Sequence, residues 1–155
     1  MSNIQNIINI ALAEIGYSEN PANSNKTKYG EWFGLNGVAW CGIFCSWVYS
    51  KAGFQLPKIG FAKGFAGCAT AVSYFKKYHT ITLSPKPGDL VFFDWNADGN
   101  YEHVGLFYDW KIPFKEFYTI EGNTSLTNQS NGGQVMKRVR KAANVLFVHP
   151  NILDV

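Results

Sequence analysis

The sequence predicts an α+β protein in which helices come first and strands follow. The N-terminal half carries apolar residues at helical spacing, whereas from residue 87 onward short aromatic and β-branched runs are separated by Gly, Asn, Pro and Asp. Helices followed by strands favour helices packed on an antiparallel sheet. Of the 155 residues, 46% are hydrophobic and 16% aromatic, which suits a well-filled core. At this length we expect one domain, residues 1–155.

The first predicted helix has the clearest periodicity. Apolar side chains recur on one stripe, at Ile4, Ile7, Ile8, Ala11, Leu12 and Ile15. Ser2 and Gln5 have the spacing of a capping box, and Gly16 is expected to end the helix. Residues 18–37, which follow, are rich in turn formers and lack periodicity, so they are expected to form a long wrapped loop, a kind of segment that is often functional.

Two further helices are expected before the strands. One begins near Cys41, after Asn36 and Gly37, and ends at Gly53. Its buried face is expected to hold Phe44, Cys45 and Val48. A shorter helix is expected within residues 67–79, with Val72 and Phe75 facing inward. The strands are expected within residues 87–95, 103–110, 116–122, 135–140 and 144–150.

Charge and apolar runs exclude two classes of partner. The net charge is +3, and the basic residues are scattered except in the run Lys137, Arg138, Arg140 and Lys141, which we expect on one face of a strand. Scattered charges do not form the positive stacking platform that nucleic acid requires. No apolar run approaches the length of a membrane span, and the N-terminus lacks the features of a signal peptide, so we expect synthesis in the cytoplasm and no membrane insertion.

The cysteines point to a free thiol. Three cysteines cannot all pair within one chain, and neither Cys-x-x-Cys nor paired histidines suggest zinc. Cys41 falls in the first turn of its helix, where free backbone N–H groups lower a thiol's pKa and favour a nucleophilic thiolate. Cys45 is expected to be a small buried hydrophobe. Cys68 precedes another helix, but nothing else singles it out.

A thiol nucleophile needs a base, and His103 is the best candidate. It begins an apolar run directly after a polar loop, which would place its imidazole at a strand entrance near the surface. His79 is expected at a solvated helix end and His149 in a structural role. A third group must orient the imidazole. Glu121 and Asn123 are one residue apart, so in extended backbone their side chains would share a face.

Four stretches together resemble a CHAP domain, the cysteine- and histidine-dependent amidohydrolase/peptidase module of bacterial and phage wall-cleaving enzymes. They are "WCGIFCSWVYSKAGFQLP", "PKPGDLVFFDWNADGNYEHVGLFYD", "YTIEGNTS" and "NGGQVMKRVR". The resemblance covers essentially the whole chain. It implies a papain-like α+β fold, with the nucleophile at a helix N-terminus and the histidine on an antiparallel sheet.

The resemblance also implies roles for individual residues. Cys41 would attack an amide carbonyl, His103 would activate the thiol and later protonate the leaving amine, and Glu121 would orient His103. Asn123 matches a polar position beside the site, and either of the last two residues would bond to His103. The substrate would be bacterial peptidoglycan, cut at the muramoyl to alanine amide or within the stem or cross-bridge. Aromatic side chains suited to its sugars and amides are Trp40, Trp32, Trp95 and Tyr101.

Residues 94–102 resemble part of a calcium loop. Asp94, Asn96 and Asp98 stand at the first, third and fifth positions of an EF-hand pattern, but Gly105 occupies the position of the bidentate glutamate. We therefore favour an Asx-rich turn over a calcium site and expect no required cofactor.

Two other functions stay open. A noncatalytic wall-binding module of the same fold would keep the architecture without activity, and a thiol amidase with a different substrate would keep the chemistry. A phage lysin released through a membrane lesion, a virion-associated lysin, or the catalytic piece of a longer enzyme would act at the wall without a signal peptide. In the last case, a separate wall-binding domain or subunit would supply targeting.

Overall fold

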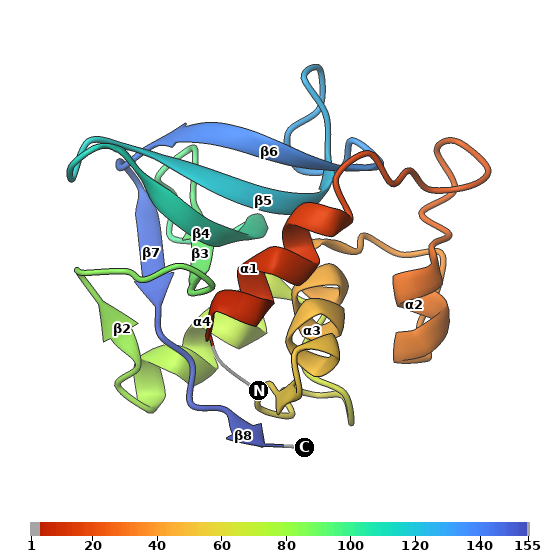
Figure 1. Cartoon of the computed structure of the whole chain (residues 1–155), viewed down its shortest axis with the longest axis horizontal. Helices are drawn as coiled ribbons and strands as arrows, with labels where there is room; N and C mark the ends of the chain where they lie inside the picture. Colours follow the sequence, from red (N-terminus) through yellow and green to blue (C-terminus); the bar gives the residue numbers. More distant parts are fainter. Residues whose placement is uncertain (1–3, 155) are drawn as a thin grey trace.

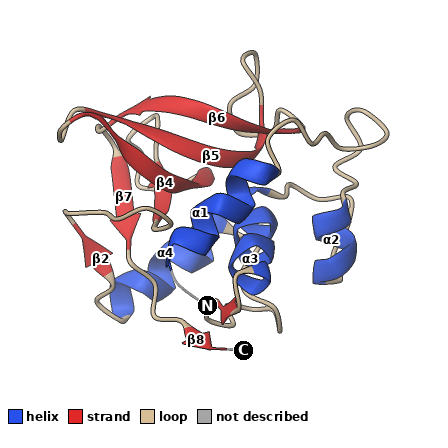
Figure 2. Ribbon diagram, viewed as in Figure 1, coloured by secondary structure: helices blue, strands red, loops and turns tan. Residues whose placement is uncertain are grey.

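The computed structural model describes residues 4–154 and combines four helices with an antiparallel sheet (Figures 1 and 2). The helices are α1 (Ile4–Ala13), α2 (Lys28–Phe33), α3 (Cys41–Lys51) and α4 (Cys68–Lys77). The predicted α+β class is therefore confirmed. The proposed capping box at Ser2 lies outside the described residues. Within these residues, the helices are all too short or too polar to cross a membrane.

The main sheet has six strands in the order β2-β7-β3-β4-β5-β6, all paired antiparallel. Their bounds are β2 Ile81–Thr82, β3 Leu90–Phe93, β4 His103–Ile112, β5 Glu116–Thr124, β6 Gln134–Lys141 and β7 Val145–Val148. A separate two-stranded ribbon joins β1 (Phe54–Gln55) to β8 (Leu153–Asp154). Helices α1 and α3 lie side by side across β4 and β5, and α2 packs on α3 away from the sheet (Figure 1).

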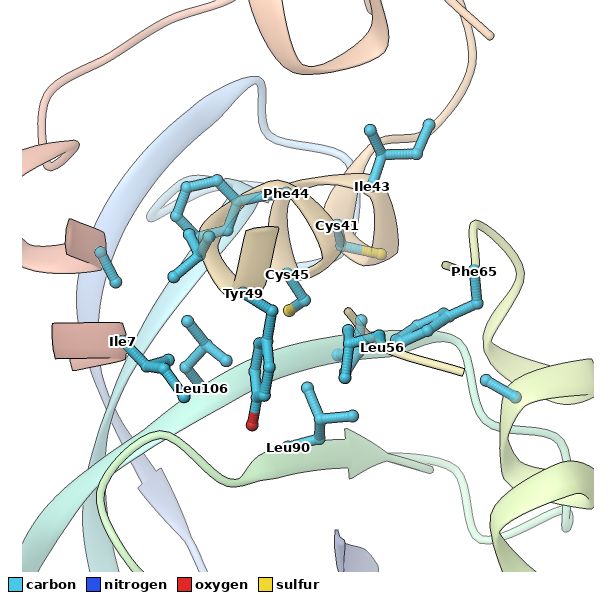
Figure 3. Close-up of a cluster of buried hydrophobic side chains, with 14 of the residues drawn as sticks. Ile7, Cys41, Ile43, Phe44, Cys45, Tyr49, Leu56, Phe65, Leu90 and Leu106 are labelled. Carbon is cyan, nitrogen blue, oxygen red and sulfur yellow. The ribbon is translucent and has the colours of Figure 1, made fainter. Parts of the chain in front are cut away.

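The centre of the sheet is buried on both faces, in two clusters of apolar side chains. Beneath the helices, Leu90 and Leu106 pack with Phe44, Cys45 and Tyr49 of α3 (Figure 3). The opposite face carries an aromatic cluster of Val91, Phe93, Phe107, Phe117 and Phe147. The central strands therefore bury the side chains on both of their faces. This explains why the sequence of β3 is a continuous apolar run rather than an alternating pattern.

The interior of α3 follows the predicted pattern. Phe44, Cys45 and Val48 are all fully buried, and the helix begins at Cys41 as expected. Val72 and Phe75 of α4 also face inward. These helices are thus held to the sheet by their apolar faces.

The prediction of an unbroken loop over residues 18–37 is wrong, because α2 forms within it. The Thr27 hydroxyl accepts a hydrogen bond from the Gly30 N–H at 2.9 Å, which caps the helix start. Burial of Tyr29 and Phe33 holds the helix in place, and Gly34 ends it in the left-handed region with φ 89°. A helix of six residues is too short for its periodicity to stand out among turn formers.

Two other expectations need correction. Ile15 lies past the end of α1 at Ala13 and is 44% exposed, so it is not part of the buried stripe. The basic run of β6 does not share one face of the strand. Arg140 is buried, whereas its neighbour Lys141 is exposed, because successive residues of a strand point to opposite faces.

Candidate active site

Cys41 is the first residue of α3, and its side chain lies almost closed off from solvent, at 5% exposure. The next residue, Gly42, touches the segment before α4 so closely that an added Cβ would lie 2.8 Å from the Ala66 carbonyl oxygen. Close backbone approach therefore brings the start of α4 against the start of α3. This approach places the Cys68 thiol, at the first position of α4, beside Cys41.

His103 begins β4, as expected, but it is fully buried, so the expectation that its imidazole lies near the surface is wrong. Its Nε2 is 2.8 Å from Oε1 of Glu121 on β5. Its Nδ1 makes no hydrogen bond within the described residues, and Cys41 acts on this imidazole as a neighbouring thiolate that raises the pKa of His103. The other histidines lie elsewhere, as expected: His79 is exposed after α4, and His149 is 2.7 Å from Asp89.

Glu121 is held by donors on both of its oxygens. Oε1 accepts from Arg140 Nη2 at 2.7 Å as well as facing His103, and Oε2 accepts from Arg140 Nε at 2.9 Å and from the Thr119 hydroxyl. A carboxylate offers about four acceptor positions, so this set fills all of them. The side chain also passes directly over Gly105, where an added Cβ would lie 2.5 Å from Glu121 Cγ. The carboxylate is therefore fixed in one orientation.

These contacts set the charges of the cluster. Burial alone would raise the pKa of Glu121, but hydrogen bonds from Arg140 and His103 outweigh it and lower that pKa to about 2. Burial alone would lower the pKa of His103, but Cys41 and Glu121 raise it to about 9. The pKa of Cys41 lies well below its usual range, chiefly because the Cys68 thiol donates to it and His103 lies beside it. The cluster thus favours a thiolate, an imidazolium and a carboxylate.

The remaining cysteines behave differently from Cys41. Cys45 is fully buried one turn deeper in α3, and burial raises the pKa of its thiol (Figure 3). The pKa of Cys68 is also raised, first by its hydrogen bond to Cys41. The sequence predicted Cys68 near a helix start but not its place beside Cys41. The spacing of residues along the chain does not indicate which two helix N-termini meet in the fold.

The Asn123 side chain bonds to the loop between β5 and β6 rather than to His103. Its backbone lies in the left-handed region with φ 59°, and the register of β5 against β6 shifts between Glu121 and Thr124. The Asn123 side chain accepts from the Gly133 N–H and donates to Asn131 Oδ1, each at 3.0 Å. Glu121 is therefore the partner of His103, and Asn123 ties together the loop between β5 and β6.

The four aromatic candidates do not line one surface. Trp40 is fully buried, stacks on Tyr29 and donates through Nε1 to Glu19 at 3.1 Å, so its expected place in a substrate groove is wrong. Trp95 is partly exposed and stacks on the His103 ring with centroids 5.6 Å apart. Trp32 and Tyr101 are partly exposed, each under a lysine ammonium, and remain candidates.

The loop before His103 forms a compact turn. Both oxygens of Asp94 accept backbone N–H groups, from Asp98 and Gly99, and Asp98 accepts from Asn100. The Asn96 amide donates to Asp98. Carboxylate oxygens of Asp94, Asp98 and Glu102 also lie within 4.8 Å of one another, a grouping that could hold a metal ion. The preference for a turn over a calcium site therefore stays a prediction. Gly105, at the position of the missing calcium ligand, instead makes room for Glu121.

Comparisons with known proteins identify the family of the chain. No curated protein sequence matches the chain. Among solved structures, the wild-type endolysin LysIME-EF1 is similar at 12% identity and a TM-score of 0.45, with 99% of this chain and 65% of the endolysin chain covered. The chain thus spans just under two thirds of that endolysin's length. A family model for the CHAP domain matches residues 33–123, more than half of the sequence, from the end of α2 through the strand that carries Glu121. The chain therefore belongs to the CHAP family.

Proposed function

We propose that this protein is a cysteine-dependent peptidoglycan hydrolase that cuts an amide bond of the bacterial cell wall. The observation that carries the proposal is the buried series Cys41, His103 and Glu121, with a thiol of lowered pKa at a helix start. A thiolate beside an imidazolium is a nucleophile and acid pair suited to amide cleavage. Membership of the CHAP family supports peptidoglycan as the substrate class.

In the proposed reaction, the Cys41 thiolate attacks the carbonyl carbon of the scissile amide. The resulting oxyanion is stabilised by backbone N–H groups at the start of α3, including that of Cys41. The tetrahedral intermediate collapses as His103 gives its proton to the leaving amine, and a thioester on Cys41 remains. His103, now neutral, takes a proton from water, which attacks the thioester. Release of the carboxylic acid restores the thiolate and the imidazolium.

Glu121 has an orienting role in this proposal. Its hydrogen bond at 2.8 Å fixes Nε2 of His103, so that Nδ1 is the ring nitrogen directed to chemistry. It also stabilises the imidazolium electrostatically. Because protein groups already occupy both of its oxygens, Glu121 is not itself expected to bond to the substrate.

The test is hydrolysis of purified Gram-positive cell walls. Wild type is compared with Cys41→Ala and with Cys45→Ala, a matched control that removes a sulfur one turn deeper in the same helix. Loss of turbidity is recorded with and without added calcium, and new amine termini are identified by mass spectrometry. We expect clearing by wild type and Cys45→Ala and none by Cys41→Ala.

The new termini distinguish the muramoyl to alanine amide from bonds in the stem or cross-bridge. Wall binding by wild type without any new terminus would refute the hydrolase and favour a binding module. Equal clearing by Cys41→Ala would refute the proposed nucleophile.

A further inference from the structure

Arg140 is a buried cation that belongs to the Cys41 cluster but has no place in the reaction described above. Its guanidinium is 6% exposed and donates two parallel hydrogen bonds to Glu121, at 2.7 Å and 2.9 Å. A third donor, Nη1, bonds to Gln129. Fork-shaped pairing of this kind fixes both the distance and the plane of a carboxylate.

Aromatic rings hold the guanidinium from its faces. The Arg140 Cζ lies 4.9 Å from the Trp95 ring centroid and 5.4 Å from that of Phe93. The same two rings flank His103, at 5.6 Å and 5.9 Å between centroids. Trp95 and Phe93 therefore position both the His103 imidazole and the Arg140 guanidinium, and Arg140 in turn neutralises the Glu121 carboxylate that binds His103.

The charges of the cluster explain why such a cation is needed. Thiolate, imidazolium and carboxylate together carry a net charge of −1, in a region shielded from water. Arg140 brings that total to zero. Without it, a buried excess of negative charge would favour uptake of a proton, and the thiolate is the group whose protonation stops the chemistry.

We propose that Arg140 is a positioning residue of this site. It holds Glu121 ionised and in the orientation that binds His103, and as a result Cys41 stays a thiolate at lower pH than it otherwise would. This inference rests on the proposed function for its biological meaning, but not for its test. Other titratable or charged groups also face the cluster: Cys45 from α3, Cys68 from α4, Arg138 from β6 and Glu102 from the loop before β4. They are unchanged in the variants below.

The test measures the thiolate directly. Full-length wild type, Arg140→Met and Lys141→Met are treated with iodoacetamide across a range of pH, and alkylation of Cys41 is quantified by mass spectrometry of its peptide. Lys141→Met is the matched control, since it removes the same charge from the next residue of β6, where the side chain is exposed. Arg140→Lys keeps the charge without the fork.

We expect the acidic limb of the Cys41 alkylation profile to move upward by roughly 1 pH unit in Arg140→Met, the lower end of the effect of an adjacent opposite charge, because Arg140 acts on Cys41 through Glu121 and His103. Lys141→Met should retain the wild-type profile, and Arg140→Lys should shift by less than Arg140→Met. Should Arg140→Met fail to fold, Arg140→Gln, which is neutral but still able to donate to Glu121, is expected to show the same upward shift.

A folded neutral variant with the wild-type profile would overturn the proposal and leave Arg140 a purely structural residue. An equal shift in Lys141→Met would also overturn it, because any nearby charge would then suffice. The failure of the proposed hydrolase function is separately visible, since it would abolish wall cleavage by wild type while leaving the alkylation profiles intact.

Discussion

Gly105→Ala tests whether the orientation of Glu121 controls activity. The added methyl would lie 2.5 Å from Glu121 Cγ, whereas ordinary van der Waals contact begins at 3.4 Å, so one group has to move by about 0.9 Å. The backbone of Gly105 is held in β4 between two paired strands, and Glu121 is held by four donors. Displacement of either therefore disturbs the hydrogen bond to His103.

Misplacement of a catalytic group by about 1 Å costs on the order of 100-fold in rate, and overpacking costs about 1–3 kcal/mol of stability. We accordingly expect kcat/KM for release of amine termini from cell walls to fall about 100-fold in Gly105→Ala. The unfolding free energy in urea should fall by about 1–3 kcal/mol, which leaves most of the protein folded if its stability is that of an ordinary domain.

Gly16→Ala is the control for lost stability alone. Gly16 has φ 98° and no atom within 4 Å of the added methyl, so alanine there introduces backbone strain of roughly 1–2 kcal/mol without contact to the site. Its kcat/KM should match wild type. If folded Gly105→Ala keeps its kcat/KM within about threefold of wild type, the rigid placement of Glu121 is not what activity requires.

Other perturbations separate electrostatic from structural roles. The pKa of His103 is raised from 6.5 to about 9 while that of Cys41 is lowered, so folding transfers a proton from the thiol to the imidazole. The pair then binds as many protons folded as unfolded between pH 6.5 and 9, and urea unfolding should show no loss of stability from this pair across that interval. Below pH 6.5 stability should fall, because the unfolded histidine takes up a proton that the folded pair does not, and stability that falls from pH 6.5 to 9 would contradict the thiolate–imidazolium pair. Trp40→Ala should lower the unfolding free energy by about 3–5 kcal/mol while KM for wall fragments stays unchanged. A raised KM would mean that Trp40 does contribute to substrate binding. Cys68→Ala should raise the pKa of Cys41, so alkylation at acidic pH slows; unchanged alkylation would mean that the thiol contact is unimportant. Asn123→Ala should cost about 1–3 kcal/mol by leaving a loop N–H unpaired, with normal activity per folded molecule, and a selective loss of activity would place it in the site.

Local patterns in the sequence determined the broad class and part of the site. Apolar periodicity predicted α1, α3 and α4, and the short β-branched runs predicted the strands, because burial imposes period 3.6 or 2 on these segments. Cys41 and His103 were identifiable because a helix start and a strand entrance are local features of the chain. Their joining into one cluster was expected only through the resemblance to the CHAP family.

Only the tertiary structure decided which distant groups complete the cluster. In the sheet register, Arg140 stands opposite Phe117 and Glu121 stands opposite Met136, so strand pairing alone does not predict their ion pair. Cys68 reaches Cys41 only because the chain passes closely over Gly42. The choice of Glu121 over Asn123 depended on a register shift and a positive φ that alternation along an extended strand does not anticipate. Sequence periodicity reports whether a residue is buried, whereas the contact between two buried groups depends on how whole elements pack.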